Sequence, residues 1–221
     1  MKSPIVQTLQ GVTLAGGGPF TARDLSLCLS RAPIVVAADG GADGLLQRGC
    51  VPQAVIGDFD SVTDAARRQI PFGAQHRIAE QETTDFDKAL RLIDAPVVLA
   101  LGFAGARLDH GLAAFNTLVV RADRRCILIG PKDVAFAAPL TLALDLAPGE
   151  VLSLFPMAPV SGRSAGLEWP IDGLDFAPGG RIGTSNRVVS RRVDLAFDGP
   201  GMLVILPRRR LDAAIRALRA V

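Results

Sequence analysis

Two aspartates separated by one residue, Asp58 and Asp60, follow an apolar run in the segment AVIGDFDSV at residues 54–62. Ionised carboxylates close to a buried strand are costly unless a partner compensates their charge. If the backbone stays extended through Phe59, both side chains lie on one face and converge. Such a pair suits Mg²⁺, which proteins usually hold with one or two carboxylates plus substrate phosphates. The alternative is a solvated turn in which one aspartate caps the next helix.

A second acidic segment, QETTDFDKAL at residues 81–90, has the pattern of a helix start. Thr84 is a favourable N-cap residue, which places Asp85 in the first turn and Lys88 three residues later on the same face. In a functional interpretation, Asp85 is a further metal ligand and Lys88 contacts phosphate. The structural alternative is a capped helix with a surface ion pair.

Further polar residues follow other expected strand ends. Asp39 precedes Gly40 and Gly41, which permit a tight turn and close approach of the backbone to an anion. The segment LGFAGARLDH at residues 101–110 adds Arg107, Asp109 and His110. Because ligands bind beyond the carboxyl ends of parallel strands, all these groups are predicted to share one rim.

The glycine stretches, including AGGGP at residues 15–19, offer backbone amides that could cradle phosphate. They match neither the GxxxxGK[ST] nor the GxGxxG pattern. Each stretch alone therefore indicates only an ordinary strand-to-helix connection, and it is their clustering on one rim that favours a ligand site.

The elements that would position these residues alternate along the first part of the chain. Apolar runs rich in branched aliphatic residues predict buried strands at residues 33–39, 54–58, 96–103 and 125–130. Helical spacing lies between them at residues 21–32, 85–94 and 108–123. In the last of these, Leu108, Leu112 and Phe115 form one apolar face. The alternation predicts an α/β fold with a mainly parallel sheet and flanking helices.

The composition changes after about residue 131, where proline and glycine become frequent. Strand-like runs cover residues 139–146, 150–157, 187–197 and 202–207, and a helical pattern returns only at residues 211–221. These features predict an antiparallel β-sandwich with a short C-terminal helix. We therefore expect an α/β catalytic domain at residues 1–131 and a β-sandwich domain at residues 132–221.

The bulk composition is that of a folded chain without a strong electrostatic partner. Its 221 residues are 49% hydrophobic and carry a net charge of +2, which indicates neither a nucleic-acid partner nor an anionic membrane. The basic cluster at residues 208–210 has no interleaved aromatic residues and is more typical of a solvated face.

Cysteine and histidine usage adds an expectation about location. The three cysteines, Cys28, Cys50 and Cys126, are widely separated, which favours reduced, buried thiols in the cytoplasm. His76 and His110 are too few and too far apart to predict a histidine-based metal site. The longest apolar stretch falls far short of the roughly 20 residues that span a bilayer. We expect a cytoplasmic protein with no membrane partner.

Four segments in order resemble the motifs of the thiamin pyrophosphokinase family. They are ADGGADGLLQRGCVPQAVIGDFDSV at residues 38–62, TTDFDKAL at 83–90, GARLDH at 105–110 and GTSNRV at 183–188. The resemblance implies an α/β catalytic domain joined to a β-sandwich. It also implies a homodimer that holds thiamin between the catalytic domain of one subunit and the sandwich of the other. The implied reaction transfers pyrophosphate from ATP to the hydroxyl of thiamin, giving thiamin diphosphate and AMP.

The resemblance also implies residue roles. Asp58, Asp60 and Asp85 would hold Mg²⁺ on the ATP phosphates, a reaction that depends mostly on positioning and on neutralising charge. Lys88 and Arg107 would add positive charge there. Asp109 would orient the thiamin hydroxyl or take its proton, unless a metal-bound carboxylate does so. The implied substrate-binding residues are Asp39, Gly40, Gln81, Thr84, Ser185 and Asn186, and Gln81, Ser185 and Asn186 match the thiamin side.

The sequence departs from the family pattern after GTSN, where an aromatic residue is often found. Only Phe197 follows, at a distance. Trp169, in GLEWPIDG, stands where the family often has an aromatic residue before that motif, or it is a core residue of the sandwich.

Two other functions remain as alternatives. A metal-dependent nucleotide-sugar glycosyltransferase also uses Asp-x-Asp, but that hypothesis leaves the TTDxxK helix start and the RLDH turn unexplained. A non-catalytic thiamin or nucleotide sensor would not require every one of the carboxylates.

Overall fold

The computed structural model describes residues 3–105 and 107–220. Ala106, in the GARLDH segment, and Val221, at the end of the predicted C-terminal helix, lie outside the described residues. The chain divides into two compact units, Met1–Thr117 and Leu118–Val221. The domain boundary expected near residue 131 from the change in composition stays a prediction.

The first unit is built on a parallel sheet with the strand order β7, β2, β3, β4, β5. The strands are β2 (Val12–Ala15), β3 (Ile34–Ala38), β4 (Ala54–Gly57), β5 (Gln75–Arg77) and β7 (Val98–Leu101). Every residue of β2, β4 and β7 is buried, as expected for parallel strands covered on both faces. The predicted mainly parallel sheet is confirmed. A short parallel pair joins β1 (Val6–Gln7) to β6 (Ile93–Asp94).

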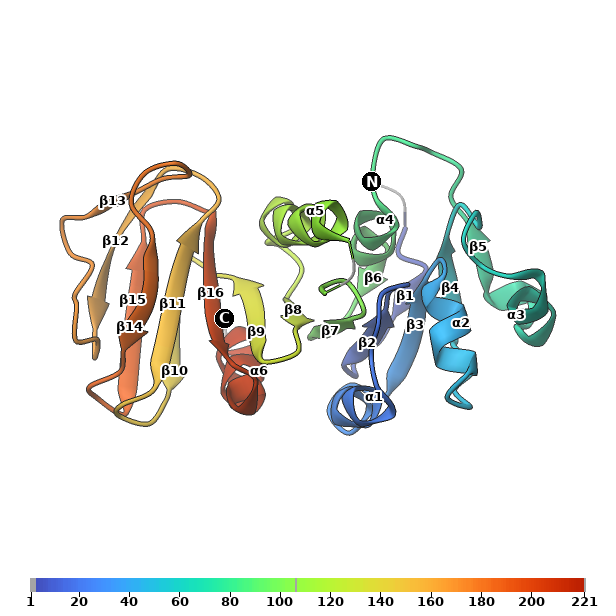
Figure 1. Cartoon of the computed structure of the whole chain (residues 1–221), viewed down its shortest axis with the longest axis horizontal. Helices are drawn as coiled ribbons and strands as arrows, with labels where there is room; N and C mark the ends of the chain where they lie inside the picture. Colours follow the sequence, from blue (N-terminus) through green and yellow to red (C-terminus); the bar gives the residue numbers. More distant parts are fainter. Residues whose placement is uncertain (1–2, 106, 221) are drawn as a thin grey trace. The chain divides into compact units, whose positions relative to one another are not determined.

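Helices connect these strands, and Figure 1 shows α1 and α2 on one side of the sheet and α4 on the other. The helices are α1 (Ala22–Leu29), α2 (Gly41–Leu46), α3 (Asp64–Gln69), α4 (Asp85–Arg91) and α5 (Leu108–Val120), with a short 3₁₀ turn at Phe72–Ala74. Thr84 caps α4 as predicted, because its hydroxyl accepts a hydrogen bond from the Asp87 amide at 3.3 Å.

Helix α5 begins at Leu108, as predicted, but much of its apolar face is exposed. Leu108 is 81% exposed and Leu112 60% exposed, whereas Ala114 and Leu118 are buried. The sequence spacing correctly indicated that Leu108 and Leu112 share one face of the helix. This part of the face is exposed and does not belong to the hydrophobic core.

The second unit contains two antiparallel sheets. One has the order β14, β11, β16, β9, β8, and the other β10, β15, β12, β13. The strands of the first sheet are β8 (Cys126–Ile129), β9 (Asp133–Ala137), β11 (Val151–Pro156), β14 (Gly183–Arg187) and β16 (Met202–Pro207). Those of the second are β10 (Thr141–Asp145), β12 (Val160–Ala165), β13 (Asp175–Phe176) and β15 (Arg192–Phe197).

Burial alternates along β10 and β11, so each sheet has one covered face. The covered faces meet where β14 approaches β13, since a Cβ added at Gly183 would lie 3.2 Å from the ring of Phe176. This arrangement confirms the predicted antiparallel β-sandwich. Strand β8 belongs to this unit, in which it pairs antiparallel with β9.

The predicted C-terminal helix is α6 (Leu211–Arg219), which follows a 3₁₀ turn at Arg208–Arg210 and packs against β10. The basic cluster is only in part a solvated face. The Nε atoms of Arg209 and Arg210 donate to the buried carboxylate of Glu150, at 3.1 and 2.6 Å. Burial would raise the pKa of Glu150, but hydrogen bonds from Arg210, the Ala147 amide and Arg209 outweigh it and leave this pKa lowered.

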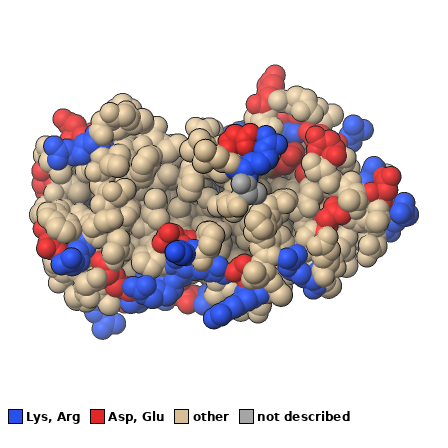
Figure 2. Space-filling model, in the orientation of Figure 1, with Lys and Arg blue, Asp and Glu red and all other residues tan. Residues whose placement is uncertain are grey.

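The surface carries both signs of charge. Figure 2 shows acidic and basic side chains next to one another in several clusters, with uncharged residues over much of the face between them. Within the described part of the chain, no helix combines the length and the apolar composition needed to cross a membrane. Cys28 and Cys126 are buried as expected, and Cys50 is half-buried.

Candidate functional site

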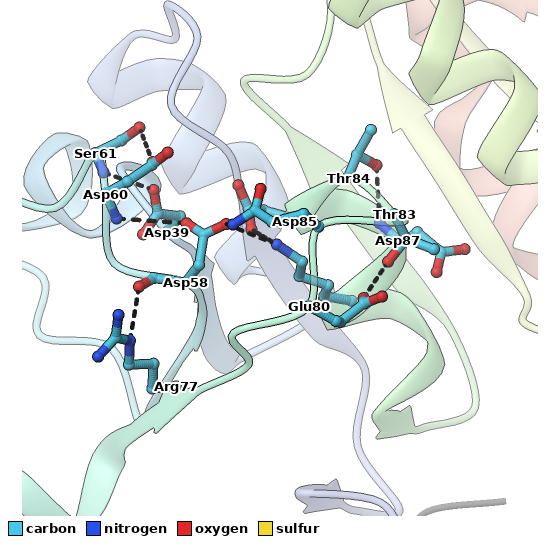
Figure 3. Close-up of polar contacts among 12 residues, drawn as sticks. Asp39, Asp58, Asp60, Ser61, Arg77, Glu80, Thr83, Thr84, Asp85 and Asp87 are labelled. Atoms are coloured by element: carbon cyan, nitrogen blue, oxygen red, sulfur yellow. Dashed lines mark hydrogen bonds and ion pairs between the residues drawn. The ribbon is translucent and has the colours of Figure 1, made fainter.

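Three aspartates converge at the carboxyl ends of β3 and β4. Asp39, Asp58 and Asp60 each offer a carboxylate oxygen, and these oxygens lie within 4.8 Å of one another. Asp39 and Asp58 are 2% and 9% exposed, whereas Asp60 is open to solvent. Figure 3 shows Asp58 between the Asp39 and Asp60 side chains and that of Asp85.

The backbone geometry behind this convergence differs from the one expected. The chain is not extended through Phe59, which adopts a left-handed conformation with φ of 68°. A bulky residue in that region costs on the order of 1–3 kcal/mol, so the surroundings must enforce it. The Arg67 guanidinium lies 5.6 Å from the centre of the Phe59 ring. The extended-strand argument was therefore wrong, and a strained turn brings Asp58 and Asp60 together.

Asp39 has the most unusual environment of the cluster. Its Oδ2 accepts a hydrogen bond from the Ser61 amide at 3.0 Å, but its buried Oδ1 has no partner among the described residues. Burial, with repulsion from Asp85, raises the pKa of Asp39 to about 6. A buried carboxylate oxygen without a partner is costly, and a cation would compensate it. Three converging carboxylates and this oxygen fit the oxygen-ligand chemistry of Mg²⁺.

A buried lysine lies beside the cluster. The Lys88 side chain is 2% exposed, and its Nζ is 2.9 Å from Asp58 Oδ2 and 3.0 Å from Asp85 Oδ1. Burial alone would lower the pKa of Lys88, but these two hydrogen bonds outweigh it and leave the pKa raised. The hydrogen bond from Lys88 lowers the pKa of Asp58, while burial raises that of Asp85. The Lys88–Asp58 pair is thus buried, whereas Asp85 remains 32% exposed.

Two further residues, one at the end of β5 and one four positions after it, also hold Asp58. Gln81 Nε2 donates to Asp58 Oδ2 at 3.0 Å, and Arg77 Nε donates to the Asp58 carbonyl at 3.1 Å. Glu80 anchors the same segment, because it accepts hydrogen bonds from Arg91 at 2.8 Å and from Thr83. Gln81, predicted on the substrate side, therefore contacts a carboxylate of the cluster, and Arg77 and Glu80 are functional candidates that the sequence analysis missed.

A cavity of about 570 Å³ opens at this rim. It reaches from Asp39, Thr84 and Asp85 to the glycine turns after β2 and β7. The strand order reverses between β2 and β7, and such a switch point is where open α/β sheets bind ligands. Gly41 is required there, because an added Cβ would lie 2.1 Å from the Ala15 carbonyl oxygen. Gly40 lines the cavity, and the close approach of its backbone to a ligand stays a prediction.

The predicted Arg107 and Asp109 form an exposed pair with each other. Arg107 Nη2 lies 2.6 Å from Asp109 Oδ2. This hydrogen bond lowers the pKa of Asp109 to about 2, which makes the carboxylate a weak proton acceptor near neutral pH. Arg107 and His110 line the cavity.

The predicted Ser185 and Asn186 lie in the second unit, on β14. The Asn186 amide binds the backbone of Trp169 twice, accepting from its N–H at 3.2 Å and donating to its carbonyl at 2.7 Å. Trp169 is 54% exposed, so it is not a core residue, whereas Phe197 is buried. The Trp169 ring borders a cavity of about 200 Å³, and the Arg187 guanidinium lies 6.0 Å from the ring centre. Ser185, with φ of 62°, donates its amide hydrogen to Ser153 Oγ.

Fold and site together define an α/β protein of two compact units, with converging carboxylates and a cavity at the carboxyl edge of a parallel sheet. The family model "Thiamin pyrophosphokinase, catalytic domain" matches residues 25–129. The model "Thiamin pyrophosphokinase, vitamin B1 binding domain" matches residues 140–201.

Thiamine pyrophosphokinases from plants and bacteria are similar in sequence to this chain over most of its length. Thiamine pyrophosphokinase 3 of Oryza sativa subsp. japonica is 29% identical over 192 residues, covering 72% of each protein. Thiamine pyrophosphokinase of Bacillus subtilis is 26% identical over 212 residues, covering 90% of this chain and 98% of the relative. The chain belongs to the thiamin pyrophosphokinase family, as its motifs predicted.

Solved structures have the same fold. Thiamin pyrophosphokinase from Geobacillus thermodenitrificans is similar with a TM-score of 0.71 and 25% identity, over 89% of this chain and 96% of that one. Yeast thiamin pyrophosphokinase is similar with a TM-score of 0.74, over 96% of this chain and 90% of that one. At 16% identity, the yeast comparison supports the fold alone.

Proposed function

We propose that this chain transfers the pyrophosphoryl group of ATP to the hydroxyl of thiamin, giving thiamin diphosphate and AMP. Family membership supports the formation of thiamin diphosphate. The single observation that carries the ATP chemistry is the cluster of Asp39, Asp58 and Asp60 at the rim where the cavity opens. Transfer between phosphates and a hydroxyl depends mainly on positioning and on compensating negative charge, and this rim offers both.

In this proposal Asp39, Asp58 and Asp60 hold Mg²⁺. Bound there with ATP, Mg²⁺ would neutralise charge on the phosphate oxygens. The set inferred from the sequence was Asp58, Asp60 and Asp85. We include Asp39 because its buried Oδ1 lacks a partner among the described residues, and we assign Asp85 to the ion pair with Lys88.

The basic residues then have different tasks. Lys88 is buried and bound to two carboxylates, so it fixes the orientation of Asp58 instead of reaching for phosphate. Arg107 is exposed and lines the cavity, where its guanidinium would contact the phosphates. Asp109, which pairs with Arg107, would orient the thiamin hydroxyl or take its proton.

Residues of the vitamin B1 binding unit would contact the rings of thiamin. Asn186 holds the backbone of the exposed Trp169, and Ser185 is its neighbour on β14. A homodimer in which the second unit of one copy completes the site of the other belongs to this proposal, as does a cytoplasmic location. The glycosyltransferase alternative is not favoured, since two domain models of one other family match this chain.

The test is to incubate the purified protein with ATP and Mg²⁺, with and without thiamin, and to identify the nucleotide product. We expect AMP only when thiamin is present, in equal amount to thiamin diphosphate. ADP would mean a single phosphoryl transfer. Turnover of ATP that does not depend on thiamin would contradict the proposed substrate.

A further inference from the structure

One carboxylate outside the cluster, Asp43 on α2, ties this helix to the loop that carries Asp58 and Asp60. Its Oδ2 accepts a hydrogen bond from the Thr63 amide at 3.1 Å, and its Oδ1 accepts one from the Thr63 hydroxyl. Thr63 is the N-cap of α3 and ends the loop between β4 and that helix. The two hydrogen bonds of Asp43 therefore join two segments that are 20 residues apart in the sequence.

The same two segments carry the carboxylate cluster. Asp39 lies two residues before the start of α2, and Asp60 lies in the loop that Thr63 ends. Ser61 links them closer to the site, because its amide donates to Asp39 at 3.0 Å and its hydroxyl donates to Asp60 at 2.8 Å. The distance between Asp39 and Asp60 thus depends on how firmly the loop is held against the start of α2.

The loop needs such ties because its own backbone does not favour this shape. Phe59, between Asp58 and Asp60, has φ of 68°, a conformation that persists only when the surroundings enforce it. Asp43 holds the loop by two hydrogen bonds, both from Thr63. Asp39 holds it by one, from the Ser61 amide. Losing the Asp43 bonds would free the end of the loop and let Asp60 move away from Asp39.

We propose that Asp43 is a positioning residue for the carboxylate cluster, acting through Thr63 and not by contact with the metal. The inference rests on the proposed metal site and deepens it. Groups that orient metal ligands from outside the coordination sphere typically change metal affinity by about 10- to 100-fold when they are removed.

The competing role for Asp43 is a direct one, because its side chain also lines the cavity. The variant Asp43→Asn distinguishes the positioning role from the direct role. Its side-chain oxygen can accept from the Thr63 amide while its NH₂ group donates to the Thr63 hydroxyl, so both hydrogen bonds survive without the charge. Asp43→Ala removes both bonds and the charge. A positioning role predicts that only the alanine variant is impaired.

The experiment measures Mn²⁺ binding to the full-length protein by electron paramagnetic resonance, without nucleotide or thiamin. We expect Asp43→Ala to bind Mn²⁺ about 10- to 100-fold more weakly than the wild type, and Asp43→Asn to stay within about threefold. The matched control is Asp64→Ala. Asp64 follows Thr63 directly, and its side chain is 85% exposed. This variant should bind as the wild type does.

Thermal unfolding without metal checks that each variant is folded. If Asp43→Ala does not fold, Thr63→Val serves instead, since it removes the hydroxyl and keeps the backbone bond to Asp43; it should weaken Mn²⁺ binding less. Steady-state kinetics should show a raised Mg²⁺ requirement for Asp43→Ala and Thr63→Val, with an unchanged KM for thiamin.

Two results would overturn the proposal: Asp43→Ala, or its Thr63→Val substitute, binding Mn²⁺ as tightly as the wild type, or Asp43→Asn binding as weakly as Asp43→Ala. The latter would show that the charge of Asp43 acts directly. A wild-type protein that binds no Mn²⁺ would instead overturn the metal site itself, and the positioning role with it.

Discussion

The two units hold their candidate residues by opposite means. In the first unit, charges are buried against one another, as in the pair of Lys88 with Asp58, and the Oδ1 of Asp39 is left without a partner among the described residues. In the second unit, a neutral amide, Asn186, satisfies the backbone of Trp169 completely. A charged cluster is costly until a ligand compensates it, whereas the amide arrangement is already satisfied. Substitutions in the two units should therefore differ in kind and in size.

The largest expected effect is on turnover, from Asp60→Asn in the first unit. The change is nearly isosteric but removes a charge from the proposed metal site, so we expect kcat to fall by about 10³-fold while the fold is retained. Activity at limiting Mg²⁺ and circular dichroism check both parts. An undiminished rate at limiting Mg²⁺ would refute the assignment of Asp60.

Lys88→Met should cause the largest loss of stability. It leaves Asp58 buried without its cation, which typically costs about 3–5 kcal/mol, measurable by urea unfolding. The matched variant in the second unit is Arg187→Met, which breaks a 3.3 Å pair with Glu168 in which both side chains are exposed. Exposed pairs contribute about 0–1 kcal/mol, so this variant should unfold nearly as the wild type does. Equal losses would mean that burial of the first pair carries no energetic weight.

The pH dependence of stability should have opposite signs in the two units. The folded pKa of Asp39, about 6, lies above its unfolded value, so ionisation of this group destabilises the fold as pH rises toward 6 and beyond. Without metal, Asp39→Asn should be more stable than the wild type by about 3 kcal/mol above pH 6, and equal to it below about pH 4.

Glu150 in the second unit should show the reverse. Its folded pKa is lowered, so its contribution is present above the unfolded pKa and is lost as pH falls through the folded one. Glu150→Gln should therefore be less stable than the wild type at neutral pH, with a difference that shrinks in acid. Thermal unfolding from pH 3 to 8 tests both variants, and the same sign for the two would contradict the assigned environments.

The smallest expected effect is on ligand affinity, from Asn186→Ala. Removing a buried hydrogen-bonding group costs about 1–3 kcal/mol, and we expect roughly a tenfold higher KM for thiamin with an unchanged KM for ATP. Trp169 is the only tryptophan of the chain, so its fluorescence reports on this position directly. Thiamin should change the emission of the wild type, and ATP alone should not. Emission that is insensitive to thiamin would separate Trp169 from the substrate site.

The sequence was most informative where residue spacing alone determines the structure. The alternation of apolar runs and helical spacing predicted the parallel sheet, and the Thr84 cap was visible as a pattern. Polar residues at strand ends predicted a shared rim. Asp39 joins Asp58 and Asp60 there because β3 and β4 are neighbours in the sheet.

Properties that depend on what covers a residue could not be predicted in the same way. Helical spacing placed Lys88 beside Asp85 but could not indicate that the Lys88 side chain is buried, or that it also pairs with Asp58. The left-handed turn at Phe59 has no local signal, because glycine is the residue that usually marks such a backbone. The contact between Asn186 and Trp169 joins residues 17 positions apart and depends on the strand pairing around them.

The central claim is the transfer of a pyrophosphoryl group, and the most direct measurement follows the β-phosphorus of ATP. ATP labelled at that phosphorus is incubated with thiamin, Mg²⁺ and the protein, and the labelled product is identified. We expect all of the transferred label in thiamin diphosphate, while the nucleotide product, AMP, is unlabelled. Label retained in ADP would contradict the claim, because the bond between the α- and β-phosphates would then have stayed intact.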